Sequence, residues 1–564
     1  MILEVLSNYI NNSLEKNNIE ARIHVIISNR RDLCDYQIDD CFRLAKSLHT
    51  SPISIGEEIV ECICNNEDFD DYFKKIEVVK PGFINITIAD KLLCKTLRNM
   101  MCTDKFGIKK PDKADTYVLD YGGPNVAKPL HVGHMRTAIV GESIRRIISY
   151  MGHKTISDVH LGDYGLQIGQ VIYGILEDKV KDEDITLEYL EEVYPRISAL
   201  SKEDALVKEK CATITRELQD GNPLYQRLWK IILKISSDDI RRLYKYLGVH
   251  FDVWQGESDA YNYIGAVEEI LNDKNLLLDS EGAKVIDVSK SDDPKEIPPV
   301  IFKKSNGAYL YATTDIATIY EREMKYHPDH ILYVVDNRQK LHFEQVFRAV
   351  KKADITDAKL EFLGYGTVNG IDGKPFKTRN GDAPKLDSLF NEIKEIFCNM
   401  KDSNSDMPEE DVDKVVNSIL KFADLQNNRD RDYIFDIEKF SNVIGKTGPY
   451  ILYTYVRINK IISEYKNNHT LSDYVYNESD RNLRLKLIEL DLSLQSAFVN
   501  RMPSYIADYI YNIAVLANNF YQSNHINGLD DIMKKNDWLF ILSLTNKILK
   551  EMLNLIIIET PSFM

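Results

Sequence analysis

Asp120-Tyr-Gly-Gly-Pro-Asn-Val-Ala-Lys-Pro-Leu-His-Val-Gly-His134 is the stretch of this 564-residue chain that decides its fold. Before it, Thr116 to Leu119 is rich in β-branched and aromatic residues, which predicts a strand. After it, apolar residues recur at helical spacing from Met135 to Met151, and Gly152 stands where a helix would stop. The sequence therefore predicts a strand, a loop and a helix that begins with two histidines.

The two histidines are the first candidate site residues. His131 and His134 are three residues apart and would share one face of the helix. The free N–H groups of a helix N-terminus favour an anionic phosphate, and Gly133 leaves room for a flat base near the backbone. We interpret this stretch as a nucleotide site suited to ATP. The alternative is a helix that happens to begin with two histidines.

The residues around the histidines carry a resemblance to a known family. The lead-in Pro124-Asn-Val-Ala-Lys-Pro129, with Arg136 after the second histidine, resembles the HIGH motif of class I aminoacyl-tRNA synthetases. In this form it resembles the arginyl-tRNA synthetases in particular. The resemblance implies an α/β fold with a Rossmann-type catalytic domain, an N-terminal α+β domain and a C-terminal all-α anticodon-binding domain.

Composition sets wider limits. A hydrophobic content of 44% and a charged content of 28% are typical of a soluble globular protein, and no apolar run is long enough to span a membrane. The eight cysteines are scattered without a paired metal-ligand pattern, so we expect no structural zinc and a reducing, cytoplasmic location. The formal charge of −16 argues against indiscriminate nucleic-acid binding but leaves room for a specific tRNA partner.

The chain divides into three predicted domains. Residues 1–112 read as an α+β unit, with strand-like segments at Ile23 to Ile27 and Phe83 to Ile88. Residues 113–400 form the predicted catalytic domain, and its charged, helical insertion lies near residues 171–240. Residues 401–564 are predicted to be helical and to bind the anticodon. We expect a monomer.

Two segments outside the catalytic domain resemble tRNA-contacting segments of the family. Lys80-Pro-Gly-Phe-Ile-Asn85 resembles a strand whose counterpart touches the elbow of tRNA, which makes Phe83 and Asn85 candidate contacts; the alternative is that Phe83 is simply core. Gly445 to Arg457 resembles the opening of the anticodon-binding domain and includes Tyr450. Leu452 and Tyr455 replace a glutamine and a histidine of that pattern, which puts contacts through those two side chains in doubt. The family ends near the anticodon, as Met564 would here.

Five residues are candidates for binding arginine. A guanidinium presents several N–H donors in one plane, and a carboxylate can accept two of them at once. In the family, the counterparts of Glu257, Tyr311 and Asp315 hold the side chain of arginine, and those of Asn125 and Gln339 hold its ammonium and carboxylate ends. Taken alone, Asp315 could be an ordinary first-turn acid of a helix.

Leu161-Gly-Asp-Tyr-Gly-Leu-Gln-Ile-Gly169 resembles another family segment. Its glycines suit a loop pressed against ligand or backbone. Asp163 and Gln167 are candidates there, although loop closure alone could explain the glycines.

A basic loop completes the predicted nucleotide site. Gly370 to Asp382 places Lys377 and Arg379 in a glycine-bounded loop that suits an arm over polyphosphate. It stands where the family has its KMSKS loop but lacks the final lysine. The resemblance to arginyl enzymes implies that a lysine just before the HIGH motif, here Lys128, compensates. The alternative is a solvated basic loop.

These observations predict one activity and leave two alternatives. The predicted activity is ATP-dependent attachment of L-arginine to tRNA(Arg) through an arginyl-adenylate, with Mg2+ bound to ATP and with release of AMP and pyrophosphate. His131, His134, Lys128 and Lys377 would stabilise charge on the phosphates. The alternatives are a non-catalytic tRNA-binding paralogue and a small nucleotidyltransferase that shares the HxGH motif.

Overall fold

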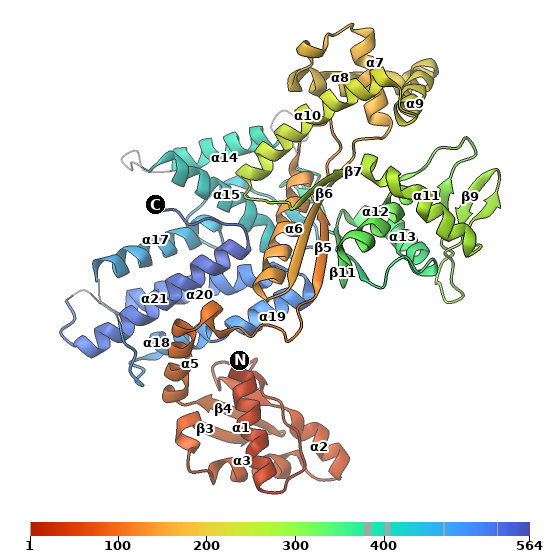
Figure 1. Ribbon diagram of the computed structural model, residues 1–564. Helices are drawn as coiled ribbons and strands as arrows, with labels where there is room; N and C mark the ends of the chain where they lie inside the picture. The colour runs from red at the N-terminus through yellow and green to blue at the C-terminus, as the bar shows by residue number, and fades with distance from the viewer. Residues whose placement is uncertain (1, 377–384, 401–406, 466–468, 527) are drawn as a thin grey trace.

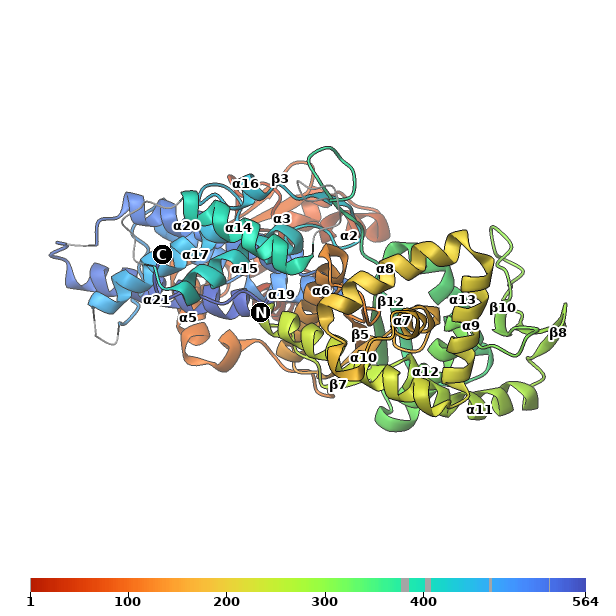
Figure 2. The same cartoon turned by 90° about the horizontal axis from the view of Figure 1, so that it is seen from above.

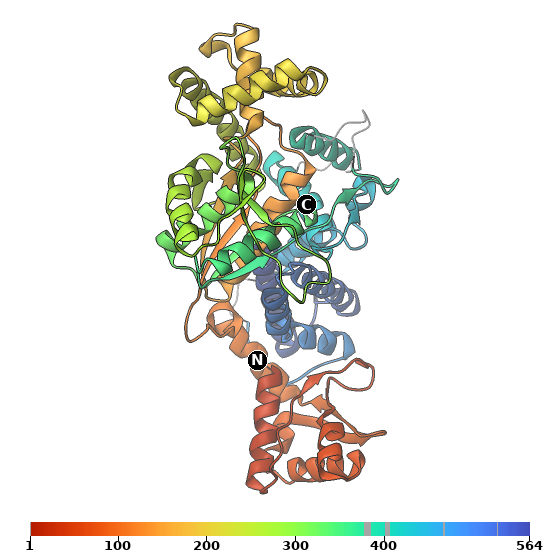
Figure 3. The same ribbon diagram turned by 90° about the vertical axis from the view of Figure 1, so that its right-hand side faces the viewer.

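The computed structural model describes residues 2–376, 385–400, 407–465, 469–526 and 528–564. Figure 1 shows three regions: an α+β unit at the N-terminus, a central sheet with helices on both faces, and a large helical region that ends at the C-terminus. In Figure 3 the N-terminal unit and the helices α7 to α10 lie at opposite ends of the molecule. This arrangement confirms the predicted α/β class with flanking α+β and all-α parts.

The central sheet has five strands in the order β12-β11-β5-β6-β7, and all neighbours are parallel. Its strands are β5 (Thr116–Tyr121), β6 (Lys154–Leu161), β7 (Val253–Gly256), β11 (His330–Val334) and β12 (Lys359–Phe362). The chain adds strands first on one side of β5 and then on the other. In such sheets a ligand binds at this switch point, beyond the carboxyl ends of the strands. The loops after β5 and β11, which carry most of the predicted site, meet there.

Alternate residues of β5 face different helices. Tyr117, Leu119 and Tyr121 belong to the core that contains α6 (Val132–Tyr150). Val118 belongs to a separate core with α11 (Glu257–Asp273), α12 (Tyr311–Tyr326) and α13 (Lys340–Lys352). This alternation is the period-two pattern of a strand covered on both faces. The sheet is therefore held between α6 on one side and α11 to α13 on the other, as Figure 1 shows.

A buried arginine joins one of these helices to the sheet. Arg322 of α12 is 1% exposed and donates to Asp120 of β5 and Asp158 of β6, each at 2.6 Å. The pairing compensates the cost of burying these charges and joins α12 to the central strands β5 and β6.

The predicted insertion is a bundle of four helices. They are α7 (Leu166–Glu177), α8 (Leu187–Glu203), α9 (Ala205–Gln219) and α10 (Pro223–Tyr246), so the helical structure begins earlier and ends later than residues 171–240. Gly169 lies inside α7 rather than in a ligand loop. A Cβ there would lie 2.1 Å from Thr215 Oγ1 of α9, so this glycine serves helix packing. A small antiparallel sheet of β8 (Leu278–Ser280), β9 (Ala283–Ile286) and β10 (Val300–Lys303) follows α11.

Helices make up most of the described residues from Leu386 to the C-terminus. They are α14 (Leu386–Met400), α15 (Glu409–Leu425), α16 (Ile437–Phe440), α17 (Gly448–Glu464), α18 (Glu478–Leu487), α19 (Leu490–Asn500), α20 (Ser504–Ser523) and α21 (Ile532–Leu555). Figure 2 shows them side by side, to one side of the central sheet. Helix α6 contacts α15, α19 and α21, so it lies between the sheet and the helical region.

The N-terminal unit packs its helices on a four-stranded antiparallel sheet of order β1-β2-β4-β3. Its elements are α1 (Ile2–Lys16), β1 (Ile26–Ile27), β2 (Tyr36–Ile38), α2 (Asp40–Leu48), α3 (Pro52–Cys64), α4 (Phe69–Tyr72), β3 (Phe73–Val79), β4 (Phe83–Ile88) and α5 (Asp90–Cys102). Arg481 of α18 donates to Asp90 at 2.8 Å and to Asp35 at 2.6 Å. These ion pairs fasten the N-terminal unit to the helical region.

One predicted strand is shorter than expected. The strand predicted from Ile23 to Ile27 is reduced to β1, because side chains satisfy the backbone before it. Asn11 pairs with both the N–H and the C=O of Ile23, at 2.8 and 3.0 Å. The N–H of Val25 donates to Ser7 Oγ at 3.0 Å. A backbone already paired with side chains has no need of a neighbouring strand.

No helix among the described residues is both long and apolar enough to cross a membrane.

Candidate active site

The two histidines cap the helix that they begin. His131 is the N-cap of α6, and its Nδ1 accepts from the N–H of Gly133 at 3.1 Å. In return, His134 Nδ1 accepts from the N–H of His131 at 3.2 Å. The rings stack with their centroids 3.9 Å apart. A Cβ at Gly133 would lie 2.9 Å from the His131 ring, so the glycine is needed first by the histidine itself.

This capping determines which ring nitrogens are free for a ligand. Burial lowers the pKa of His131, and the nearby Lys128 lowers it further. Burial lowers the pKa of His134 to about 3, with added repulsion from His131 and Lys128. Both rings are therefore neutral at pH 7. Since each Nδ1 accepts a hydrogen bond, each proton resides on Nε2, which leaves two N–H donors for a ligand.

Lys128 lies beside the histidines, as the sequence predicts for a cation of this site. Its Nζ is 4.7 Å from the ring centroid of Tyr194, which belongs to α8. The insertion therefore contributes a wall to the site.

The described chain resumes, after the predicted basic loop, beside the site. Lys377 and Arg379 lie outside the described residues, which stop at Phe376 and resume at Lys385. The backbone of Lys385 pairs with that of His131, and the N–H of Leu386 donates to the carbonyl of Leu130 at 3.0 Å. Lys385 and Leu386 therefore lie next to the first histidine.

A group of acids lies at the starts of α11 and α12. Glu257 is the first residue of α11, and its carboxylate has no hydrogen-bond or ion-pair partner within the part of the chain that the structure describes. Burial raises the pKa of Glu257 to about 8, and the negative charges of Asp163 and Asp315 raise it as well. A carboxyl group has a raised pKa when it is buried without a cation nearby to stabilise its charged form.

The other two predicted side-chain contacts are close by. Asp315 lies one turn after Tyr311 on α12, and Asp315 Oδ2 is 2.6 Å from His342 Nε2 of α13. Tyr311 is 55% exposed, and a Cβ at Gly165 would lie 3.2 Å from its hydroxyl. Burial and the charge of Glu257 raise the pKa of the Tyr311 hydroxyl. The structure therefore brings Glu257, Tyr311 and Asp315 together.

Asn125 and Gln339 lie on two loops beside the switch point. Asn125 Oδ1 accepts from Gln167 Nε2 at 3.2 Å. A Cβ at Gly162 would lie 2.1 Å from this oxygen, so the glycine makes room for the asparagine. Gln339 ends a short 3-10 helix after β11, and its side chain is exposed. The loop after β5 thus brings Asn125 to the site, and the loop after β11 brings Gln339.

Two further residues position this group of acids. His342 holds Asp315, as described above. Asp163 accepts from the N–H and the hydroxyl of Ser258, at 3.0 and 2.6 Å, and so fixes the first turn of α11 next to Glu257. The sequence singles out Asp163 without a role. No local pattern reveals His342, which lies 27 residues from its partner.

The candidate tRNA contacts lie far from this group. The Phe83 ring is half-buried and packs edge-on against Phe42, with centroids 4.8 Å apart. Asn85 is 6% exposed and accepts from Gln37 at 2.8 Å. Tyr450 lies in the first turn of α17, and its hydroxyl accepts from Asn518 at 3.0 Å. Roles in tRNA binding remain predictions for all three.

The C-terminal tail is held by one buried carboxylate. Asp411 of α15 is 2% exposed and accepts from the N–H groups of Ser562 and Phe563 at 3.1 Å and from the Ser562 hydroxyl at 2.6 Å. Phe563 is 48% exposed, and Met564 packs partly against the core. The tail therefore has a fixed place, and its contact with an anticodon remains a prediction.

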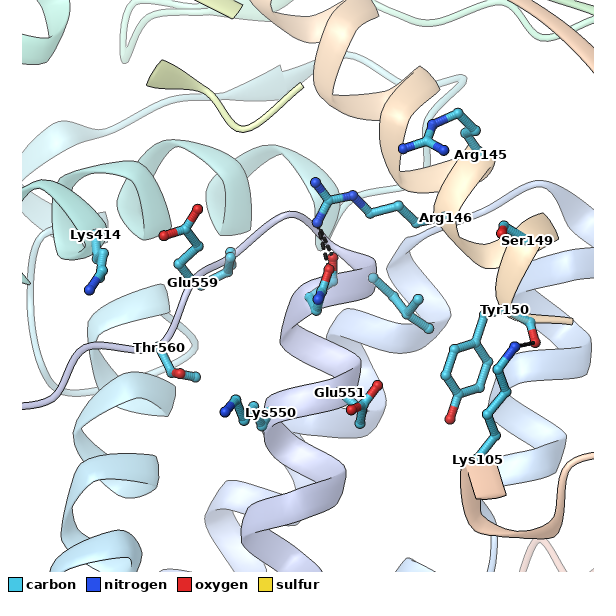
Figure 4. A pocket seen from close by; sticks show the side chains of 13 residues that line it. Lys105, Arg145, Arg146, Ser149, Tyr150, Lys414, Lys550, Glu551, Glu559 and Thr560 are labelled. Carbon is cyan, nitrogen blue, oxygen red and sulfur yellow. Dashed lines mark hydrogen bonds between the residues drawn. The ribbon is translucent and has the colours of Figure 1, made fainter. Parts of the chain in front are cut away.

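A cavity of about 740 Å3 lies at the opposite end of α6 from the histidines. Figure 4 shows Arg145 and Arg146 of α6 with Lys105, Lys550 and Glu559 around it. Arg146 donates to the backbone oxygen of Asn554 at 2.8 Å, and Lys105 to that of Tyr150 at 2.8 Å. Arg146 and Lys105 thus bind the carbonyl groups at the ends of helices. The Nε2–H groups at the start of α6 differ from them, because they are left for a ligand.

No group of three or more His, Cys, Asp and Glu side chains that could hold a metal ion is found among the described residues. All eight cysteines are free thiols.

Three family models match successive parts of the chain. Residues 2–88 match the arginyl tRNA synthetase N terminal domain, and residues 96–437 match the catalytic domain of tRNA synthetases class I (R). Residues 451–564 match the DALR anticodon binding domain.

Individual relatives cover the whole chain. The arginine–tRNA ligase of Alkaliphilus oremlandii is 39% identical, over 100% of both chains. The solved arginyl-tRNA synthetase of Plasmodium falciparum superposes with a TM-score of 0.83 at 24% identity, over 100% of this chain and 99% of the other. That of Thermus thermophilus superposes with a TM-score of 0.82 at 20% identity, over 100% of both chains. These two structures support the fold.

Proposed function

The chain belongs to the class I arginyl-tRNA synthetases, and from that premise we propose which of its residues carry the reaction. It is an arginine–tRNA ligase: it attaches L-arginine to tRNA at the expense of ATP. The carboxylate of arginine attacks the α-phosphorus of ATP, the bond to the β-phosphate breaks, and pyrophosphate leaves. A ribose hydroxyl of tRNA then attacks the arginyl carbonyl, and AMP leaves.

Arginine is held by the group of acids at the starts of α11 and α12. The open carboxylate of Glu257 is the observation that carries this proposal, because a raised pKa and a missing cation are what a guanidinium would correct. Asp315 offers a second carboxylate, and Tyr311 a hydroxyl and a ring face. Asn125 and Gln339 are assigned to the ammonium and carboxylate ends of the amino acid, close to the switch point.

ATP is placed over the start of α6. The two Nε2–H donors of His131 and His134 point to a role in binding phosphate oxygens, with Lys128 supplying positive charge. Gly133 keeps the backbone accessible there. Lys377 and Arg379, outside the described residues, are assigned to the same polyphosphate from the other side. Donors that are already oriented need no rearrangement as negative charge builds up on the phosphates.

Mg2+ enters this scheme as part of the substrate. The phosphate oxygens of ATP bind the ion, and Mg2+ is held in sites of this kind mainly by phosphates, water and one or two carboxylates. The chain's own task is to align the two reactants.

The macromolecular partner is tRNA(Arg). Phe83 and Asn85 in the N-terminal unit are assigned to the body of the tRNA, and Tyr450 and Met564 to the anticodon side. The chain is assigned to the cytoplasm as a monomer. Eight free thiols fit a reducing compartment.

One assay tests this assignment directly. Bulk tRNA is incubated with the protein, Mg-ATP and each labelled amino acid in turn. We expect label on tRNA with arginine alone. Binding of tRNA without charging by any amino acid would favour the non-catalytic paralogue.

A further inference from the structure

Arg136 belongs to the motif that begins α6, yet it points away from the histidines into the core. It is 1% exposed. Its guanidinium donates to the backbone carbonyls of Gly366, Arg429 at 3.3 Å and Arg431 at 3.1 Å. Its Nε lies 3.3 Å from the carboxylate of Asp424, which is also 1% exposed. One side chain thus reaches α15 and two loops that are far apart in the sequence.

Those two loops are paired with each other along their length. The strands β13 (Val368–Asn369) and β14 (Tyr433–Ile434) are parallel neighbours. The N–H of Gly366 donates to the carbonyl of Arg429 at 3.1 Å, and the N–H of Phe435 donates to that of Asn369 at 2.8 Å. Arg136 therefore binds the point at which the two segments first meet.

The pairing is tight around the guanidinium. A Cβ at Gly366 would lie 2.4 Å from the backbone carbon of Arg431. The rings of Tyr365 and Tyr433 lie 5.9 and 5.0 Å from the guanidinium carbon. Interiors packed this closely transmit displacements instead of absorbing them.

Both segments lead to the proposed site. The first accepts, at Tyr365 O, from the N–H of Asn337 at 3.0 Å. The second accepts, at Asp430 O, from the side chain of Asn337 at 3.0 Å, two residues before Gln339. Arg136 itself lies two residues after His134.

We propose that Arg136 is a positioning residue for ATP: its guanidinium sets the start of α6 at a fixed distance from the paired segments 364–369 and 429–435. The inference rests on the proposed placement of ATP over His131 and His134. A guanidinium suits this task because it is a rigid planar fork with five donors, whereas an ammonium is a point charge on a flexible stem.

The test substitutes Arg136→Lys and measures ATP–pyrophosphate exchange with arginine and tRNA present. Lysine keeps a cation near Asp424 but gives up the fork that reaches three carbonyls. We expect the KM for ATP to rise about tenfold or more, because small misplacements of reacting groups are costly. The KM for arginine should rise less than that for ATP, since Arg136 touches none of the acids that would hold arginine and the paired segments reach it only through the loop of Gln339.

Two further variants complete the design. Arg145→Lys is the matched control: Arg145 is on the same helix but pairs with Glu142 and lies beside the distant cavity of Figure 4. We expect it to lower the melting temperature without changing the KM for ATP. Gly366→Ala displaces the same segments without touching α6, and should raise the KM for ATP as Arg136→Lys does.

The possible results distinguish a wrong role for Arg136 from a wrong function for the protein. An unchanged KM for ATP in Arg136→Lys, with activity falling only as the folded fraction falls, would make Arg136 a structural residue and overturn the proposal. Should that variant not fold, Gly366→Ala decides on the same criterion. Wild-type protein that fails to charge tRNA with arginine would instead refute the proposed function.

Discussion

Glu142 and Glu257 are both helical carboxylates turned into the protein, and their surroundings are opposite. Glu142, in the middle of α6, is 0% exposed and accepts from Arg145, Arg146 and the hydroxyl of Tyr121. Glu257, at the start of α11, is half-buried among other acids and has no such partner among the described residues. A buried carboxylate that is paired with arginines of the protein contributes to stability. A buried carboxyl group without such a cation indicates a binding site for a cationic ligand.

The pKa values of the two groups express the same difference. Burial raises the pKa of Glu142, but the bonds from Arg145 and Arg146 outweigh it and leave that pKa lowered. For Glu257, burial and the acids Asp163 and Asp315 act in the same direction, and the pKa is raised to about 8. Only the first group is a carboxylate at pH 7 in the free protein. The second becomes one when a cation arrives.

The largest effects should come from exchanging each carboxylate for its amide. Glu257→Gln should weaken arginine binding by about 2–5 kcal/mol, because it removes one partner of a desolvated charged pair. Glu142→Gln should instead destabilise the fold by about 3–5 kcal/mol, because two arginines lose their buried partner. Calorimetric arginine titration and denaturant unfolding of both variants measure the two quantities.

The comparison predicts that each variant shows only one of the two effects, loss of arginine binding or loss of stability. Glu257→Gln should unfold at nearly the wild-type denaturant concentration, and folded Glu142→Gln should bind arginine normally. Loss of arginine affinity in Glu142→Gln, with Glu257→Gln unaffected, would reverse the two assignments.

The next effect concerns the open donors at the start of α6. His134→Asn keeps an oxygen near the position of Nδ1, which caps the helix, but loses the Nε2–H. His134→Gln keeps a donor near the position of Nε2 and loses the cap. We expect exchange to fall about 100-fold in His134→Asn, as when one donor to a developing oxyanion is removed.

The glutamine variant makes this test specific. His134→Gln should retain more activity than His134→Asn while being the less stable protein, because it breaks the cap. If His134→Asn were instead the more active as well as the more stable variant, His134 would act through the helix cap and not through a ligand.

The smallest effect is expected in the C-terminal tail, where Asp411 already pairs with donors of the protein itself. Ser562→Ala removes the hydroxyl donor to Asp411 but keeps the two backbone donors. We expect a loss of about 0.5–1.5 kcal/mol of stability, the usual net worth of one hydrogen bond, measured by urea unfolding. Alanine at Ser543, whose hydroxyl bonds only its own helix, is the control. A larger loss than for Glu142→Gln would contradict the ranking.

The sequence predicts well those features that depend on local spacing. The strand, loop and helix around His131 follow from periodicity, and so does the shared face of Tyr311 and Asp315 on α12. Both require only residues that are near one another in the chain. The mutual capping of the two histidines is equally local, but it depends on ring orientation, which spacing alone does not specify.

Features made by distant segments could not be predicted in this way. The pairing of His342 with Asp315, and of Arg136 with loops 230 to 295 residues later, exists only once the chain has folded. Arg136 stands next to the histidines in the motif, yet it turns to the opposite side of α6. The shortening of β1 has a similar cause, since side chains of α1 satisfy its backbone.

The most direct test of the central claim is proton release when arginine binds. In the free protein at pH 7 the raised pKa of Glu257 keeps its carboxyl group protonated; a bound guanidinium favours the carboxylate, so a proton must leave. Calorimetry of arginine binding in buffers of different ionisation enthalpy counts these protons. We predict release of about one proton per arginine at pH 7, declining above pH 8, with affinity rising between these pH values. Binding without proton release, equally tight at pH 7 and pH 9, would contradict the claim that Glu257 becomes ionised when it binds the guanidinium of arginine.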